Sequence, residues 1–238
     1  MSNSSLVAYT KISPNKTSPR NHAIDTITIH CAVGQCTAER LGAIFAPTSK
    51  KASSNYGIGT DGKIGMYVEE KDRSWCSSNA ANDNRAITIE CASDAKEPYA
   101  VNDKVYASLI NLLADICQRN GIKKLVWSDA KKDRVNHLNG CNMTVHRDYA
   151  AKSCPGTYLY SRQAQIAEEV NARLGGTSTT TSTLKYKTSA NSPVYKEPPT
   201  QLGRIVSAGV FTITEVKGNY GKLKSGQGWI DLRDAKKI

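Results

Sequence analysis

Residues 144–156 carry side chains that could bind a metal ion and use it in catalysis. They read T-V-H-R-D-Y-A-A-K-S-C-P-G and place His146 and Cys154 eight positions apart, with Lys152 between them. Imidazole and thiolate groups are ligands that Zn²⁺ prefers. The gap is too long for one helix face and favours a strand end followed by a loop that folds back. Two ligands do not make a site, and the alternative is a surface histidine and an unrelated buried cysteine.

A third ligand is offered by the strand predicted over residues 24–30, which read I-D-T-I-T-I-H. Their alternation places Ile27 and Ile29 on one face, and Thr28 and His30 on the other. His30 therefore ends the strand on its polar face. The alternative for this residue is a strand-end histidine that only forms hydrogen bonds.

Residues 86–91, A-I-T-I-E-C, predict a second strand of the same kind, with Glu90 on its polar face. If helices cover the isoleucine faces of both strands, the polar faces are left to line a cleft. His30, His146 and Cys154, with the fourth position left to water, would then form a catalytic zinc site rather than a structural one.

The other periodic segments predict a mixed α/β domain with a central sheet flanked by helices. A helix capped by Thr37 is expected to end at Phe45, and a longer one capped by Asn102 is expected to end near Asn120. Asp61-Gly62 between two short strand-like runs predicts a hairpin within residues 55–68. The remaining expectations are an arm over the fold at 1–22, a polar loop at 71–85, a strand at 124–127 and a helix from 157 to 174.

A linker is predicted over residues 175–183, which read G-G-T-S-T-T-T-S-T and cannot build a core. The linker would separate a catalytic domain, residues 1–174, from a second domain, residues 184–238. The second domain has no helical period. Short alternating runs at 210–216 and 228–232 indicate that it is a small all-β domain.

The chain of 238 residues has a net charge of +11, which favours an anionic partner, either nucleic acid or an acidic cell envelope. Basic residues interleaved with aromatics on one face would indicate nucleic-acid binding. The basic residues here are scattered, so we expect no nucleic-acid partner. Ten Lys and Arg stand against four Asp and Glu after residue 183, a net of +6, so the excess is concentrated in the second domain.

The seven cysteines are an odd number and include no C-x-x-C pair, which argues against a disulfide framework. No apolar run has the length of a transmembrane helix, and the first residues do not resemble a signal peptide. We therefore expect synthesis in the cytoplasm, no membrane insertion and a monomeric protein.

Five separated motifs stand out in the first domain: I-T-I-H at 27–30, N-Y-G-I-G-T-D-G-K-I at 55–64, W-C-S-S-N at 75–79, I-T-I-E at 87–90 and H-R-D-Y-A-A-K-S-C-P-G at 146–156. Together they resemble the zinc-dependent N-acetylmuramoyl-L-alanine amidases, which share their fold with peptidoglycan recognition proteins and phage lysozyme-type amidases. The resemblance covers roughly residues 20–174. The C-terminal region resembles a bacterial SH3-like wall-binding module, with Trp229 in its late Gly-Trp strand. The whole layout is similar to phage endolysins and autolysins of Gram-positive hosts, clostridial ones in particular.

The resemblance implies an enzyme that cleaves the amide between N-acetylmuramic acid and L-alanine in peptidoglycan. It implies that Zn²⁺ is bound by three residues, His30, His146 and Cys154. It also implies that Tyr56 and Lys152 stabilise the oxyanion, and that Glu90 transfers the proton. Each of these three residues has a structural alternative. Tyr56 could be an aromatic packed in the sheet, Lys152 a solvated lysine, and Glu90 the partner of a nearby arginine.

Trp75 and Asn79 are expected to contact glycan or peptide, unless they only anchor their loop. A rival to the enzyme is a non-catalytic peptidoglycan recognition protein, although such relatives typically lack the cysteine ligand that Cys154 matches. The expected partners are peptidoglycan and anionic wall polymers. A wall hydrolase without a signal peptide would be released through a holin-type pore, as phage endolysins are.

Overall fold

The structure, a computed structural model, describes residues 2–175, 184–198, 200–217, 219–225 and 227–237. The chain divides into two compact units, residues 1–176 and 177–238. The linker predicted at 175–183 lies, apart from Gly175, outside the described residues. None of the described helices combines the length and the apolar character needed to cross a membrane.

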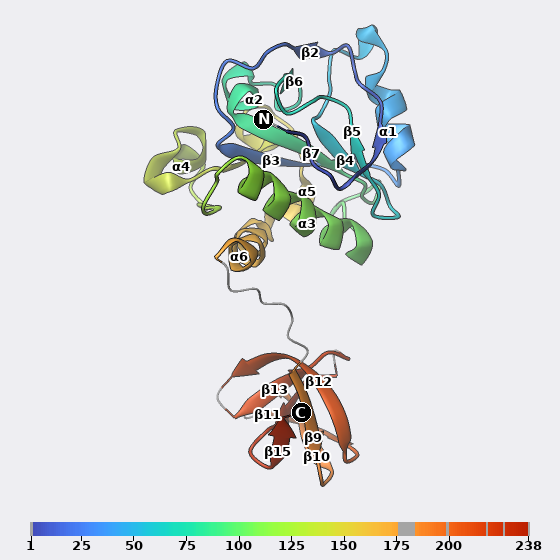
Figure 1. Ribbon diagram of the computed structural model, residues 1–238, viewed down its shortest axis with the longest axis vertical. Helices are drawn as coiled ribbons and strands as arrows, with labels where there is room; N and C mark the ends of the chain where they lie inside the picture. Colours follow the sequence, from blue (N-terminus) through green and yellow to red (C-terminus); the bar gives the residue numbers. More distant parts are fainter. Residues whose placement is uncertain (1, 176–183, 199, 218, 226, 238) are drawn as a thin grey trace. The chain divides into compact units, whose positions relative to one another are not determined.

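The first unit is a mixed α/β domain built on a six-stranded sheet with the order β1-β5-β4-β7-β3-β8 (Figure 1). β7 lies between β4 and β3 and is parallel to both, and β8 is parallel to β3. β4 and β5 form the predicted antiparallel hairpin. The strands are β1 Val7–Thr10, β2 Lys16–Thr17, β3 Thr26–Cys31, β4 Tyr56–Ile58, β5 Ile64–Met66, β6 Arg73–Ser74, β7 Ala86–Cys91 and β8 Met143–Val145.

Two helices of this unit begin at the capping side chains that the sequence predicted. Thr37 accepts a hydrogen bond from the Arg40 amide at the start of α1, and Asn102 accepts one from Val105 at the start of α3. Both predicted helices are confirmed. The helices are α1 Ala38–Phe45, α2 Ala80–Arg85, α3 Asp103–Arg119, α4 Lys131–Val135, α5 Gly156–Tyr160 and α6 Gln163–Leu174, with 3₁₀ turns at Thr48–Lys50, Leu138–Gly140 and His146–Asp148.

One face of the sheet packs against helices, as the isoleucine pattern predicted. Ile27, Ile29, Ile87 and Ile89 are fully buried in one apolar cluster that also contains Leu109 of α3. Burying each such side chain contributes about 1.5–3 kcal/mol. Figure 1 shows α3 and α6 on this side of the sheet. The apolar face therefore fixes the direction in which the opposite, polar face points.

The polar face is covered as well, which corrects the expectation of an open cleft along it. Segment 71–85 forms β6 and α2 instead of a plain polar loop. The Thr28 hydroxyl lies 2.8 Å from that of Thr144 and accepts a 3.0 Å hydrogen bond from the side-chain Nδ2 of Asn82. The Thr88 hydroxyl lies 2.7 Å from that of Ser74. Each buried hydroxyl thus has a polar partner, which removes most of the cost of its burial.

The first 22 residues do more than lie over the fold. β1 adds a parallel strand beside β5, and β2 pairs with β6. Arg20 is buried, and its guanidinium donates to the carbonyl oxygens of Glu70, Asp72 and Asn84. The expectation of a simple arm missed these contacts because the segment has few apolar residues.

Two further expectations were wrong. Residues 124–127 form no strand, because side-chain amides take their backbone groups: the Leu125 and Val126 amides donate to Asn171 and Asn142 at 2.7 and 2.8 Å. The helix expected over 157–174 is interrupted, since Arg162 has φ −104° and ψ 3°, outside the helical range.

The second unit is all-β, as expected, but its strands form one row of seven with the order β11-β10-β14-β13-β12-β9-β15. In the described residues the end strands β11 and β15 are not paired with each other, so the SH3-like closed barrel is not observed. Val194, Ile213, Leu223 and Ile230 form its small core. Its strands are β9 Leu184–Thr188, β10 Ser192–Glu197, β11 Thr200–Val206, β12 Gly209–Lys217, β13 Tyr220–Leu223, β14 Trp229–Asp231 and β15 Ala235–Lys237.

Candidate metal centre

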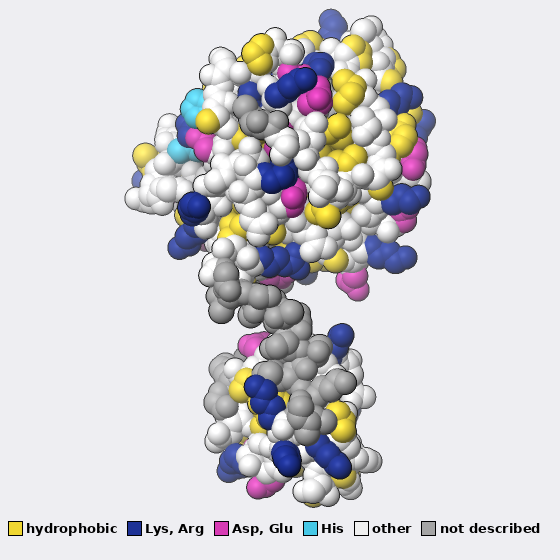
Figure 2. All heavy atoms as spheres, viewed as in Figure 1, with side chains coloured by type: hydrophobic (Ala, Val, Ile, Leu, Met, Phe, Trp, Pro, Cys, Tyr) yellow, Lys and Arg dark blue, Asp and Glu magenta, His cyan; other side chains and the backbone are white. Residues whose placement is uncertain are grey.

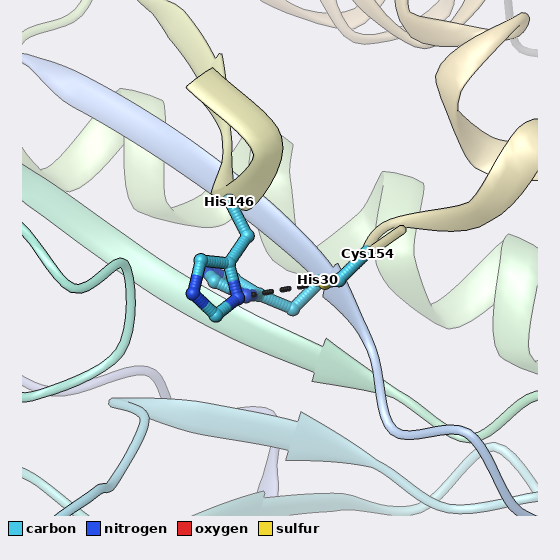
Figure 3. Close-up of side chains that lie close together, drawn as sticks. All are labelled: His30, His146 and Cys154. Atoms are coloured by element: carbon cyan, nitrogen blue, oxygen red, sulfur yellow. Dashed lines mark hydrogen bonds between the residues drawn. The ribbon is translucent and has the colours of Figure 1, made fainter. Parts of the chain in front are cut away.

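Three predicted ligands converge at the carboxyl end of β3. One donor atom from each of His30, His146 and Cys154 lies within 4.8 Å of the other two. Cys154 Sγ is 3.4 Å from Nδ1 of His30, and the two imidazole centroids are 5.1 Å apart. Figure 3 shows the three side chains meeting from separate segments of the chain. The sequence brings these donors together through the end of β3, the turn after β8 and the loop before α5.

His30 and Glu90 share a face of the sheet because their strands are in register. His30 is directly opposite Glu90 in the parallel pair of β3 and β7, so both side chains point to the same side. Oε1 of Glu90 is 4.0 Å from Nδ1 of His30. The alternative of Glu90 as an arginine partner is not seen, since no arginine forms an ion pair with it among the described residues.

His146 begins the 3₁₀ turn that follows β8, and a buried ion pair fixes this turn. The Asp148 carboxylate accepts the Val145 amide at 3.1 Å and both guanidinium contacts of Arg134, at 2.9 and 2.5 Å. The exposed fractions of the Arg134 and Asp148 side chains are 2% and 1%. Arg134 also stacks over the ring of Trp127, 4.4 Å from its centroid. Trp127 therefore supports the turn.

Ser78 orients the His146 ring, because its hydroxyl lies 3.1 Å from Nε2. This contact leaves Nδ1 of His146 available to a metal ion. Such contacts to the second ring nitrogen commonly fix the orientation of a ligand imidazole. Cys154 is held by the Cys31 amide, 3.4 Å from its sulfur.

The electrostatics of the site follow from burial. Burial, followed by the charge of His146, lowers the pKa of His30 to about 3, so His30 is neutral and can donate a lone pair. Burial and the charge of Lys152 also lower the pKa of His146. Burial, followed by the nearby Cys31 thiol, raises the pKa of Glu90 to about 8. A bound cation would draw the pKa of Glu90 down again.

A Zn²⁺ ion fits these residues on the evidence of their own atoms. Two zinc ligands with bonds of about 2.1 and 2.3 Å at a tetrahedral angle lie about 3.6 Å apart, close to the observed separation of Cys154 Sγ and His30 Nδ1. Glu90 Oε2 is buried and has no hydrogen-bond partner among the described residues. Two neutral imidazoles and one thiolate match the donor set of a three-ligand site with an open position.

Tyr56 lies away from this group. It stands opposite Ile89 in the register of β4 and β7, and the next residue, Gly57, is opposite Glu90. Its side chain therefore points to the helix-covered face, where its hydroxyl donates to Glu70 at 2.7 Å and accepts the Ser4 amide at 3.0 Å. This placement does not support the direct catalytic role that the resemblance implied.

The other expected site residues fall into three surroundings. Lys152 is exposed on the loop between His146 and Cys154. Trp75 lines a pocket of about 210 Å³ together with Glu90 and His146. The Asn79 side chain accepts the Asn82 amide and caps α2, and Asn79 lines a different pocket of about 510 Å³.

Sequence reasoning missed Ser78, Arg134 and Asp148. Ser78 belongs to the quoted W-C-S-S-N motif, so its position beside predicted substrate contacts was an available signal. No comparable signal marked Arg134, because an arginine in a polar segment usually lies on the surface.

The fold is similar to several solved structures. A selenomethionine derivative of AmpD has 18% identity and a TM-score of 0.52, over 70% of this chain and 99% of that chain. PlyL has 14% identity and a TM-score of 0.50, over 68% of this chain and 95% of its own. A mutant endolysin from Bacillus subtilis has 16% identity and a TM-score of 0.50, over 68% and 97%. At these identities the likeness shows a shared fold.

The sequence itself identifies the family. A comparison with curated protein sequences found no match. Residues 20–157, more than half of the chain, match the model of the family described as N-acetylmuramoyl-L-alanine amidase. The matched range spans the predicted ligands and ends just after Cys154. The chain therefore belongs to the N-acetylmuramoyl-L-alanine amidase family.

Proposed function

We propose that this protein is a zinc-dependent peptidoglycan hydrolase that cleaves the amide bond between N-acetylmuramic acid and L-alanine. The observation that carries the proposal is the convergence of His30, His146 and Cys154, with Glu90 4.0 Å from His30 and bordering a pocket. Family membership supports the reaction class. The donor set supports the metal, which when bound would supply a water of lowered pKa and polarise the scissile carbonyl.

Glu90 is the group we assign to proton transfer. Its carboxylate would accept a proton from the attacking water and return it to the nitrogen of the departing L-alanine. A carboxyl group with a pKa near the working pH suits both transfers. The side chain is 16% exposed, so it is buried enough to be perturbed and still reaches the pocket.

Lys152 is the group we assign to the developing oxyanion. It is exposed on the ligand loop, and its charge is felt at His146. An ammonium group near the reacting carbonyl stabilises negative charge that forms in the transition state. Trp75 would cover the part of the substrate that enters the pocket, since its indole is fixed by a 3.0 Å hydrogen bond to Thr17.

The second unit is assigned to wall attachment. The net charge of +6 after residue 183 suits anionic wall polymers, which attract basic surfaces at low salt. On the face shown in Figure 2, Lys and Arg side chains occur on both units. Removal of residues 177–238 should weaken co-sedimentation with purified cell walls. Unchanged co-sedimentation would mean that the second unit does not bind the walls.

The proposed reaction is tested by zinc content together with mass spectrometry of digested peptidoglycan, with and without chelator. We expect about one Zn²⁺ per chain, as a three-ligand site requires, and chelator-sensitive release of stem peptides from intact glycan strands. Cut glycan strands would contradict the assigned bond. Bound Zn²⁺ without any cleavage would favour the rival assignment of a non-catalytic recognition protein.

A further inference from the structure

A second group of metal-binding side chains adjoins the proposed zinc site and includes a residue that the proposed reaction does not use. Donor atoms of His30, Cys76 and Glu90 lie within 4.8 Å of one another. Cys76 Sγ is 3.9 Å from Oε1 of Glu90. This separation is close to the about 3.6 Å expected between a sulfur and an oxygen that bind the same Zn²⁺.

The Cys76 thiol is held in place by its loop. The Cys76 amide donates to Oδ2 of Asp83 at 3.0 Å, and the Ser77 amide donates to Oδ1 of the same carboxylate at 3.1 Å. Asp83 is buried in α2 and so anchors the loop to the domain. The sulfur is therefore positioned beside Glu90 before any ion arrives, which reduces the ordering cost of binding.

The two donors also face an accessible space. Cys76 and Glu90 both line the pocket of about 210 Å³, and in the part of the chain that the structure describes no group forms a hydrogen bond with the buried Oε2 of Glu90. We propose that Cys76 and Glu90, next to His30, form a second and weaker site for a thiophilic divalent cation such as Zn²⁺. Water would complete its coordination from the pocket.

Two features make this site weaker than the first. His30 belongs to both groups of donors, so when the first ion uses its Nδ1 atom the second keeps two protein ligands instead of three. Lys50 lines the same pocket, and its charge opposes a second cation. The second site therefore fills only when Zn²⁺ exceeds the amount that saturates the first.

Occupation of this site has a functional consequence that rests on the role proposed for Glu90. A carboxylate bound to a cation cannot accept a proton from water. Excess Zn²⁺ would therefore inhibit the hydrolase, while the first equivalent supports it. The binding itself does not depend on the reaction, so the two claims can fail separately.

The test titrates Zn²⁺ into the full chain and measures both bound metal and hydrolysis of cell walls. The matched variants are Cys76→Ser and Cys36→Ser. Both residues are partly exposed free cysteines, but Cys36 is in neither group of donors among the described residues. We expect two equivalents of Zn²⁺ for the wild type and Cys36→Ser, and one for Cys76→Ser. Inhibition by excess Zn²⁺ should disappear in Cys76→Ser alone.

Two outcomes would overturn the second site: one equivalent in the wild type at high Zn²⁺, or a second equivalent that persists in Cys76→Ser. If Cys76→Ser does not fold, Cys76→Ala replaces it, and alkylation of Cys76 in the wild type is followed by mass spectrometry as Zn²⁺ is raised. If one equivalent of Zn²⁺ already protected Cys76 completely from alkylation, the second site would also be contradicted. Two equivalents of bound Zn²⁺ in the wild type, with no hydrolysis at the first equivalent in the wild type and in Cys76→Ser alike, would instead contradict the proposed function and leave the second site standing.

Discussion

Cys154 Sγ lies 3.4 Å from Nδ1 of His30, although the two residues are 124 positions apart. The contact joins the end of a central strand to a loop near the end of the domain. It is short enough for one ion to bind both atoms. Because the same imidazole nitrogen lies 4.0 Å from Glu90, His30 also connects the proposed metal position to the proposed base.

Replacement of Cys154 by serine is expected to remove zinc and activity together. A hydroxyl is a poor substitute for a thiolate ligand. Removing a group that only orients a ligand lowers metal affinity by about 10–100-fold, so removing the ligand itself should lower zinc affinity by more. Zinc content and wall hydrolysis measure the two effects, and circular dichroism checks the fold. Full activity in a folded Cys154→Ser protein would contradict the metal site.

Glu90→Gln is expected to lower kcat by about 10²–10⁴-fold with zinc content unchanged, because the amide cannot accept the proton. Tyr56→Phe is the matched control. Its hydroxyl is also buried and hydrogen-bonded, but to Glu70 on the opposite face of the sheet. The control should lose stability and keep kcat. A large loss of kcat in Tyr56→Phe would restore the catalytic role that the resemblance implied.

Ser78→Ala is expected to weaken zinc binding by about 10–100-fold without unfolding the protein, since it removes the contact to Nε2 of His146. Ser161→Ala is a suitable control, because among the described residues its hydroxyl donates only to the Tyr158 carbonyl oxygen in α5. Competition with a chromophoric chelator measures both affinities. Equal affinities in the two variants would show that Ser78 does not orient the ligand.

The elements with a strong local pattern could be predicted from the sequence. The alternation of Ile27 and Ile29, the cap at Asn102 and the turn at Asp61-Gly62 depend on neighbouring residues, and the structure contains each element. The position of His30 and Glu90 on the same face of the sheet could also be predicted, because residues in register on parallel strands share a face.

Features that depend on contacts between distant residues could not be predicted in this way. The run at 124–127 has a strand-like composition, but the side chains of Asn142 and Asn171 take its backbone groups. The catalytic role of Tyr56 was expected from a sequence motif. A motif does not show on which face of the sheet a residue lies. The pairing of Tyr56 with Ile89 decides that question, and pairing is a tertiary property.

The contact between Lys16 and Asp72 is expected to stabilise the fold less in acid. Burial raises the pKa of the Asp72 carboxyl, but hydrogen bonds from Lys16 and Ser18 outweigh it, so the pKa lies below its ordinary value. The contribution is present above the unfolded pKa of about 4 and is lost as pH falls through the lower folded value. Urea unfolding from pH 6 downward should therefore be less pH-dependent in Asp72→Asn. An unchanged slope would contradict the prediction.

Arg134→Met is expected to destabilise the domain by about 3–5 kcal/mol, because it leaves the Asp148 carboxylate buried without its partner. Arg85→Met breaks a similar bidentate pair with Asp25, but those side chains are 32% and 37% exposed, so the cost should be about 0–1 kcal/mol. Urea unfolding compares the two variants. The turn that carries His146 depends on Asp148, so Arg134→Met should also bind zinc more weakly, which Arg85→Met should not. Equal losses of stability in the two variants would show that burial does not distinguish the pairs.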